Sequence, residues 1–192
     1  MKRLILSLTL LWLGCASLFA QNWYQVGFKI GTSFPISRNY SLEGDRLTGL
    51  LDGEFNVFFR AGKIIYGEVG IGYAFYKGDF TNDNVGFSNV RVETRHLQLP
   101  VKAVANLKLG KSVTFLPFVG IIYQPVLKVT DNGIGYDKKS INTNQTLLTG
   151  GIDLKFGPII LGANYRCSLK PFFRYKEGAK FQYINICAGF QF

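Results

Sequence analysis

The sequence of 192 residues is poor in the residue types that most often carry chemistry, with one histidine, three cysteines and one methionine. It also lacks a long apolar run after its N-terminal segment. A transmembrane helix needs about 20 consecutive apolar residues, and the longest uncharged stretch, SVTFLPFVGIIYQPVL, is interrupted by Pro117, Gly120 and Pro125. We therefore expect no membrane-spanning helix in residues 21–192. One histidine and separated cysteines do not make a metal-ligand set, so we expect no metal and no cofactor.

The N-terminal segment MKRLILSLTLLWLGCASLFA has two basic residues, an apolar stretch and small residues before position 21. This order is typical of a secretory signal peptide. We predict a signal peptide over residues 1–20 and a single mature domain over residues 21–192. Cys15 resembles a lipidated cysteine, but Trp12 stands where a lipobox has an aliphatic residue, so the prediction is an unlipidated chain.

Aromatic residues make up 15% of the sequence and there are 22 glycines, which favours strands and tight turns over helices. Apolar and polar residues alternate with a period of two in eight segments. These segments are residues 23–34, 50–60, 64–76, 89–109, 113–129, 148–156, 159–166 and 183–192. The connections alternate between long ones and the short sequences AGK, GKS and GP. This pattern predicts an all-β fold, an eight-stranded antiparallel up-and-down barrel with turns at one end and loops at the other.

Alternation alone fits two kinds of barrel, because a soluble lipocalin-like barrel is apolar inside and a membrane barrel is apolar outside. The polar faces combine glycines with charges of both signs, which suits the crowded interior of a narrow barrel. The apolar faces are ladders of about ten residues, the length of one membrane crossing. The last strand alternates up to Phe192, so it can close against the first strand and leave no free edge. We therefore predict a transmembrane barrel in a bacterial outer membrane. The charges expected in its lumen are Asp52, Glu54, Glu68, Glu93, Asp153, Lys29, Arg60, Arg91, Arg95, Lys102, Lys155 and Arg166.

Three features disturb the simple pattern. The alternation changes phase at Arg95–His96, which predicts a β-bulge. Pro100 and Pro117 lie inside predicted strands, where proline removes a ladder donor, and they require further bulges or strands that project past the membrane. Residues 113–129 are apolar on both faces, so the sequence does not decide which of these side chains face lipid.

The segments HLQLPVKAVANLKLG and TFLPFVGIIY resemble the PorT-like family of bacterial outer-membrane barrels. Leu97, Leu99, Pro100 and Val101 match the family's first motif, with His96 where an aromatic residue is usual. The family's second motif is matched by Pro117, Phe118, Val119 and Gly120. The resemblance implies an eight-stranded outer-membrane barrel. The family's namesake belongs to a protein secretion machine, so the resemblance also raises membership in a secretion or envelope-assembly complex.

Few residues invite a catalytic hypothesis. A lipid-modifying barrel enzyme would need His96 near a serine and a carboxylate, and Ser88 and Glu93 are not at convincing cross-strand offsets. We interpret His96 as a hydrogen-bonded residue of the bulge and predict no catalytic site. Cys167 is expected on the outer face and Cys187 in the lumen, about 20 Å apart along paired strands, so we predict two free thiols.

The function predicted from the sequence is a structural or interaction role, through the outer loops or the periplasmic rim. Basic and aromatic residues of the segment SLKPFFRYKEGAK could contact lipopolysaccharide, and the expected partners are outer-membrane lipid, lipopolysaccharide and envelope proteins. The net charge of +10 is explained by a membrane location, so we expect no nucleic acid partner. The alternatives are a small passive channel, a lipid-modifying enzyme and a soluble lipocalin-like binder of apolar ligands.

Overall fold

Alternating strands dominate the computed structural model, which describes residues 24–36, 45–49, 53–82, 87–110, 112–130, 138–139, 141–171, 180 and 182–192. Residues 45–49, 78–82 and 87–92 are described by their backbone alone. The strands are β1 (Tyr24–Pro35), β2 (Asp45–Gly49), β3 (Gly53–Gly62), β4 (Ile65–Asn82), β5 (Phe87–Ala105), β6 (Leu107–Lys108), β7 (Val113–Val129), β8 (Asn144–Phe156), β9 (Ile159–Ser168) and β10 (Gln182–Gln191). Within these ranges, no helix is long and apolar enough to cross a membrane.

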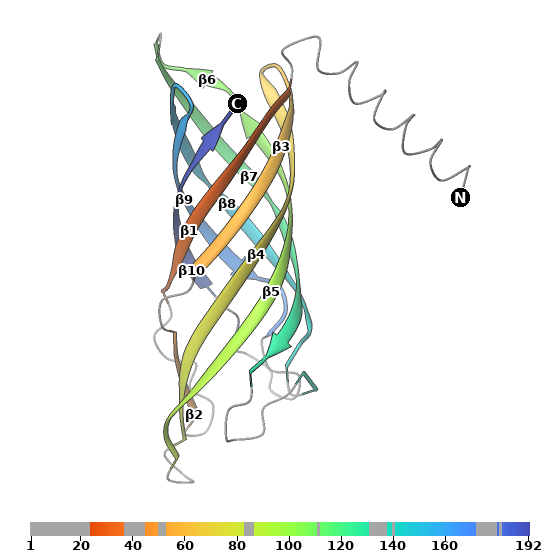
Figure 1. Ribbon diagram of the computed structural model, residues 1–192, viewed down its shortest axis with the longest axis vertical. Coiled ribbons are helices and arrows are strands. Elements are labelled where there is room, and N and C mark those ends of the chain that lie inside the picture. Colours follow the sequence, from red (N-terminus) through yellow and green to blue (C-terminus); the bar gives the residue numbers. More distant parts are fainter. Residues whose placement is uncertain are drawn as a thin grey trace, which may run out of the picture.

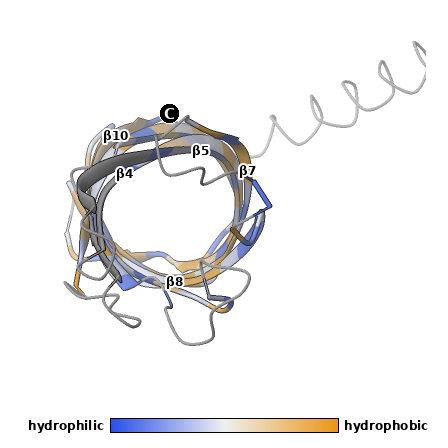
Figure 2. Cartoon of the chain, turned by 90° about the horizontal axis from the view of Figure 1, so that it is seen from below, coloured by the Kyte–Doolittle hydropathy of each residue, from blue (hydrophilic) through white to orange (hydrophobic). Residues whose placement is uncertain are grey.

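Eight of the strands close into one antiparallel barrel in the order β1–β3–β4–β5–β7–β8–β9–β10, and β10 pairs back onto β1. The view along the axis shows the strands closing into a ring (Figure 2). The turns β3–β4, β6–β7 and β8–β9 lie at one end, called the turn end below, together with β6 and residue 192 (Figure 1). The opposite end, called the loop end, carries β2, which pairs with the last part of β4. The predicted eight-stranded up-and-down barrel is confirmed.

The closing pair depends on a close backbone approach. Phe28 pairs with Phe190 and Lys29 pairs with Gly189. A Cβ atom on Gly189 would collide with the carbonyl oxygen of Phe28 and would lie 2.9 Å from the Cα of Lys29. Only glycine therefore lets β10 reach β1 at this point. The turn between β8 and β9 uses a second glycine, Gly157, whose φ of +57° is in the left-handed region.

The barrel is apolar outside and polar inside, as predicted. Phe55, Ile71 and Ile186 are 46%, 56% and 53% exposed on the outer face, whereas Glu54 and Arg166 are 9% and 4% exposed in the lumen. A soluble barrel has the reverse arrangement, because water would meet the apolar face. The lipocalin-like alternative is therefore wrong, and the chain is an outer-membrane β-barrel that presents its apolar belt to lipid.

Two predicted connections are shorter than expected from the sequence. The segment 77–88 was expected to be a loop, but β4 continues to Asn82 and β5 begins at Phe87. The segment 35–48 was likewise expected to be a loop, and it contains the start of β2. Apolar alternation fails beyond the membrane because strands there have no lipid face, and hydrogen bonding between β2, β4 and β5 sets their length. The other two long connections were predicted at about Thr130–Asn144 and Ser168–Ala179, and their residues 131–137, 140 and 172–179 lie outside the described residues, as do the predicted strand residues 50–52.

The bulge near His96 is present, but the extra residue is on the partner strand. Arg95 pairs with Lys128 and His96 pairs with Val126, so Leu127 of β7 is the unpaired residue. Strand β5 keeps its phase, with Arg95 exposed and His96 buried. The prediction that Glu93 and Arg95 face the lumen is wrong, because this end of β5 leaves the apolar belt. The two side chains form an outward ion pair of 3.2 Å.

Neither proline shifts the strand register, so the first of the two predicted alternatives, a bulge at each proline, is wrong. The ladder between β4 and β5 skips two rungs, at Leu99 and Pro100, and resumes in the same register. The ladder between β5 and β7 stops at the pair Val104–Phe118 and resumes in β6, with Pro117 in the gap between them. Each proline therefore sits where a neighbouring ladder is interrupted and no donor is needed.

Candidate functional site

The lumen holds the buried charges of the barrel and is therefore the candidate site. Toward the turn end, Arg60 donates from Nε to Glu68 Oε2 at 2.5 Å and from Nη2 to Asp153 Oδ2 at 2.7 Å. Lys29 reaches the same Asp153 oxygen at 2.5 Å, and Lys102 reaches Glu68 Oε1 at 2.7 Å. These five side chains, called the lower ion cluster, come from five different strands, β1, β3, β4, β5 and β8. Their charges give the lower ion cluster a net charge of +1.

A second ion pair crosses the lumen nearer the loop end. Arg166 of β9 donates to both carboxylate oxygens of Glu54 of β3, at 2.6 and 2.8 Å. The Arg166 Nε donates to Asn164 Oδ1 at 2.7 Å, and Asn164 donates to Asn185 at 3.0 Å. A bidentate, fully buried pair of this kind fixes both side chains. It joins walls of the barrel that are 112 residues apart in sequence.

Apolar and aromatic side chains fill the lumen between the lower ion cluster and the turn end. Tyr66, Val104, Leu116 and Phe118 form a buried cluster at the turn end. The Nζ of Lys102 lies 4.8 Å from the ring centroid of Phe118, so the aromatic face also contacts the lower ion cluster. The doubly apolar pattern of β7 is thereby explained, because Leu116 and Phe118 face the lumen while Val119 and Ile121 face lipid.

His96 does not form a catalytic constellation with the residues considered from the sequence. Its Nε2 lies 2.9 Å from Thr94 Oγ1, and its ring packs edge-on against Tyr76 with centroids 5.0 Å apart. Glu93 points outward toward Arg95, and the side chain of Ser88 lies outside the described residues. His96 is a buried, hydrogen-bonded wall residue beside the bulge, as predicted.

The lumen leaves little open space between these side chains. A cavity of about 20 Å³ lies between the lower ion cluster and the Glu54–Arg166 pair. That volume is enough for about one water molecule. Eight-stranded barrels are narrow enough for side chains to fill them, and among the described residues the paired charges leave only this small cavity between the lower ion cluster and the Glu54–Arg166 pair.

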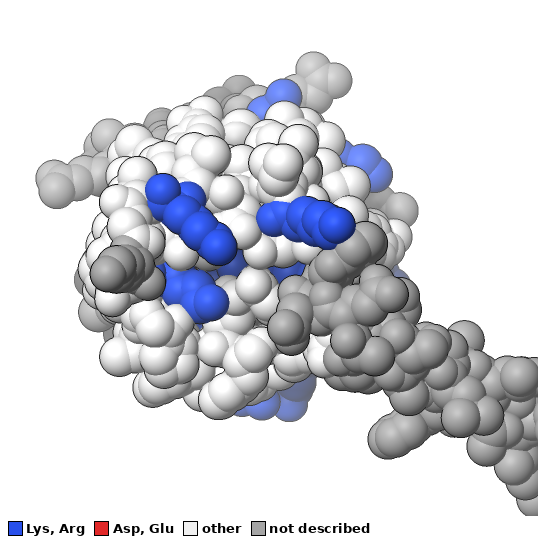
Figure 3. Space-filling model, turned by 90° about the horizontal axis from the view of Figure 1, so that it is seen from above, with Lys and Arg blue, Asp and Glu red and all other residues white. Residues whose placement is uncertain are grey.

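A wider hollow opens at the turn end. The turn-end basin has a volume of about 400 Å³. Its polar lining residues are Gln25, Lys63, Tyr66, Asn106, Lys108, Thr114, Lys155 and Gln191. Looking onto this end, Lys and Arg side chains stand around a hollow and no Asp or Glu side chain is visible (Figure 3). The basin was not anticipated as a site, although the alternation had already placed Lys155 on the inner face.

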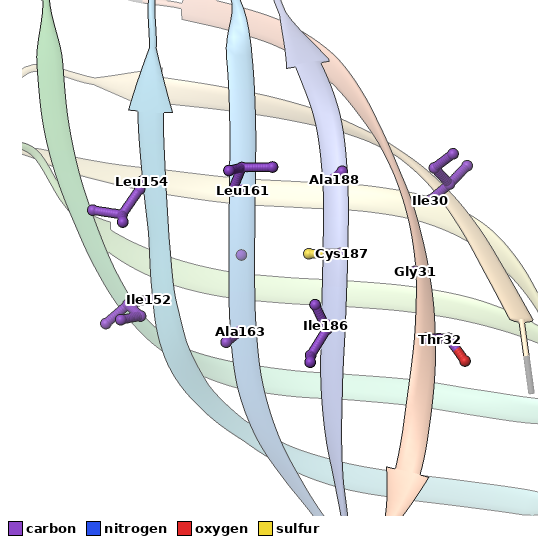
Figure 4. Close-up of a pocket in the computed structure, with 11 residues that line it drawn as sticks. Ile30, Gly31, Thr32, Ile152, Leu154, Leu161, Ala163, Ile186, Cys187 and Ala188 are labelled. Atoms are coloured by element: carbon purple, nitrogen blue, oxygen red, sulfur yellow. The ribbon is translucent and has the colours of Figure 1, made fainter. Parts of the chain in front are cut away.

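The outer wall carries an apolar groove of about 640 Å³ across β1, β10, β9 and β8. Large side chains such as Ile30, Leu161 and Ile186 stand around small residues, among them Ala163 and Ala188 (Figure 4). The groove lies within the apolar belt, so lipid chains cover it. The side chains of Thr32 and Cys187 also line it.

The two cysteines are free thiols, as predicted. Cys187 of β10 pairs with Gly162, while Cys167 of β9 pairs with Gln182, five residues away along β10. Among the described residues no group of His, Cys, Asp and Glu side chains could hold a metal ion. The aromatic and basic residues 172–179, expected at the outer rim, lie outside the described residues.

No family model matches the sequence, and no curated protein matches it. Among solved structures, the chain is similar to the outer membrane protein Ail of Yersinia pestis in a phospholipid bilayer nanodisc. The two sequences are 17% identical, the match covers 88% of this chain and 99% of that chain, and the TM-score is 0.42. A crystal structure of Ail with the heparin analogue sucrose octasulfate gives 15% identity over 88% and 97% of the two chains and a TM-score of 0.42. LpxR from Salmonella typhimurium gives 8% identity over 86% and 99%, with a TM-score of 0.37. These similarities are low, and the architecture described above rests on the strand pairing itself.

Proposed function

We propose that this outer-membrane barrel is non-catalytic and acts through its surfaces, as a structural or docking component of the bacterial envelope. The observation that carries the proposal is the filled lumen. Arg60, Glu68 and Asp153 are at most 1% exposed, and Asp153 of β8 is paired across the lumen with Arg60 of β3, which also binds Glu68 of the neighbouring strand. A pathway for ions through the lumen would require these pairs to break, which disfavours the passive channel.

The two ends of the barrel remain as the surfaces that can meet partners. At the loop end, Arg95, Lys128 and Lys170 are exposed. Cations beside the apolar belt suit contact with lipopolysaccharide phosphates. The turn end faces the periplasm when short turns are periplasmic, as in other outer-membrane barrels. Membership in a secretion or envelope-assembly complex, which the resemblance to the PorT-like family raises, is part of this proposal.

Planar-bilayer recording tests the proposal. The refolded chain 21–192 should give no conductance steps, while a variant that removes the two central members of the lower ion cluster, Arg60→Ala with Asp153→Ala, serves as the positive control for an opened lumen. Stable unitary steps from the unaltered chain would overturn the proposal in favour of the passive channel.

A catalytic role is tested separately by incubating the refolded chain with lipopolysaccharide and phospholipid and analysing the lipids by mass spectrometry. We expect no change in lipid mass. A modification that His96→Ala abolishes would show that the protein is an enzyme.

A further inference from the structure

The turn-end basin has a regular construction that the plugged lumen does not require. Lys108 of β6 pairs with Thr114 of β7, and Thr114 pairs with Lys155 of β8. All three residues share the inner face, because they continue the alternation of Val104, Leu116 and Asp153, which are buried. Neighbouring strands are about 4.8 Å apart. The backbones of the two lysines are therefore about 10 Å apart on a single rung, with a hydroxyl between them.

The opposite wall of the basin adds a third cation and several amides. Lys63, in the β3–β4 turn, lines the basin beside Asn106. Asn106 donates to the Lys63 carbonyl oxygen at 3.1 Å and to the Tyr66 hydroxyl at 2.7 Å, which fixes this wall. Gln25 donates to the same hydroxyl at 3.3 Å. The walls are thus built from hydrogen-bonded side chains.

The charge below the basin has the same sign. Gln191, in the basin lining, accepts from Nη1 of Arg60 at 3.0 Å. Arg60 belongs to the lower ion cluster, whose net charge is +1. None of the described residues that line the basin is acidic. The potential at the turn end is therefore positive, and the ligand that fits it is an anion.

The chemistry of the lining favours a peptide over a phosphate. Lysine ammonium groups pair with either anion. After the hydrogen bonds within the wall are made, Asn106 keeps its Oδ1 as an acceptor, and Gln25 and Gln191 each keep a second amide N–H as a donor. A phosphate has only acceptors, whereas a peptide backbone also donates. In an extended peptide, acidic side chains two positions apart are about 7 Å from each other, and flexible lysine side chains on one rung span that separation.

We propose that the turn-end basin binds an extended acidic segment of a periplasmic protein, with carboxylates at alternate positions paired to Lys63, Lys108 and Lys155. This inference rests on the proposed docking function and names the chemistry of its periplasmic partner. The basin is an opening of a closed barrel, so the segment binds at the rim and does not pass through.

The test uses the refolded chain 21–192 in detergent and a fluorescent peptide of sequence Glu-Ser-Glu-Ser-Glu, with Gln-Ser-Gln-Ser-Gln as the neutral probe. The basin variant carries Lys63→Gln, Lys108→Gln and Lys155→Gln. The matched control changes the same charge at the loop end, through Lys128→Gln, Lys138→Gln and Lys170→Gln, all of which are exposed. Heat-modifiable gel migration verifies that each variant is folded.

We expect the acidic peptide to bind the unaltered chain, with affinity falling as salt rises. The basin variant should bind about tenfold more weakly, and the control should bind as the unaltered chain does. Equal binding by the basin variant and the control would overturn the inference. Tighter binding of inorganic pyrophosphate or of a soluble peptidoglycan fragment than of the acidic peptide would also overturn it. Neither result bears on the docking function, which fails only if the unaltered chain conducts ions or modifies lipid.

Discussion

Removing one partner of the buried Glu54–Arg166 pair should destabilise the barrel far more than removing both. In Glu54→Gln, the Arg166 guanidinium stays in the lumen without its carboxylate. In Arg166→Met, the Glu54 carboxylate keeps only the Gln98 amide, at 3.3 Å. Both side chains are about 95% buried, with side-chain exposures of 5% and 4%. Breaking a buried ion pair by removing one partner costs about 3–5 kcal/mol.

The structure favours the lower end of this range of lost unfolding free energy. The cavity of about 20 Å³ adjoins both side chains, so one water molecule can enter and hydrate part of the remaining charge. We therefore expect each single variant to lose about 3 kcal/mol of unfolding free energy. The double variant, Glu54→Gln with Arg166→Met, has no buried charge at this pair, and Asn164 Oδ1 still accepts from Thr149 at 3.4 Å. Its loss should be smaller than the sum of the single losses by about 2 kcal/mol or more.

Urea unfolding of the refolded chain in lipid vesicles measures these free energies, with tryptophan fluorescence and gel migration as separate probes of folding. Reversibility is verified from both directions. Single losses below about 1 kcal/mol, or additive losses in the double variant, would show that the pair is hydrated and would refute the filled lumen.

Three further predictions concern the wall. Ile186→Arg, on the lipid face, should cost about 2–4 kcal/mol in the same vesicle assay, while Ile64→Arg at the turn end should cost less than about 1 kcal/mol; equal costs would contradict the assigned apolar belt. Gly189→Val should lower folding stability by at least about 2 kcal/mol because the added atoms collide with backbone of β1. Gly67→Val is its control, since a Cβ there has no neighbour within 4 Å, and a stable Gly189→Val barrel would refute the close approach. A maleimide should label at most one thiol in the folded chain because Cys187 is 7% exposed, and mass spectrometry should find both labelled after unfolding; double labelling of the folded barrel would contradict its burial.

Period-two alternation predicted the eight barrel strands, and the facing of most of their residues, because each strand has lipid on one side and a polar lumen on the other. The opposition of Glu54 to Phe55, and of Asn185 to Ile186, is visible in the sequence and preserved in the structure. The connections predicted the topology, because short turns at one end force antiparallel neighbours. The free thiols followed from facing and register together.

Alternation failed where the strands have no lipid contact. Glu93 and Arg95 face outward because that part of β5 is beyond the apolar belt, and the bulge residue Leu127 is on the strand whose two faces are both apolar. Pro100 could not be placed from sequence because its tolerance depends on an interrupted neighbouring ladder.

The pairing of charges across the lumen was also beyond prediction from sequence. Which cation meets which anion depends on the stagger of the closed barrel, and not on facing alone. Lys29 and Asp153 are 124 residues apart in sequence. The turn-end basin was missed for the same reason, because its lysines come together only when β6, β7 and β8 are in register.

The cross-lumen pairs also constrain how the protein can enter a bilayer. Lys29 on β1 reaches its partner on β8, and Glu54 on β3 reaches its partner on β9. A partly assembled sheet lying open in the membrane would present these ions to hydrocarbon with no counter-ion, at a cost of several kcal/mol each. Curling of the sheet and passage into the hydrocarbon must therefore advance together, with β1 and β10 meeting before the inner face loses contact with water or with an insertion machine.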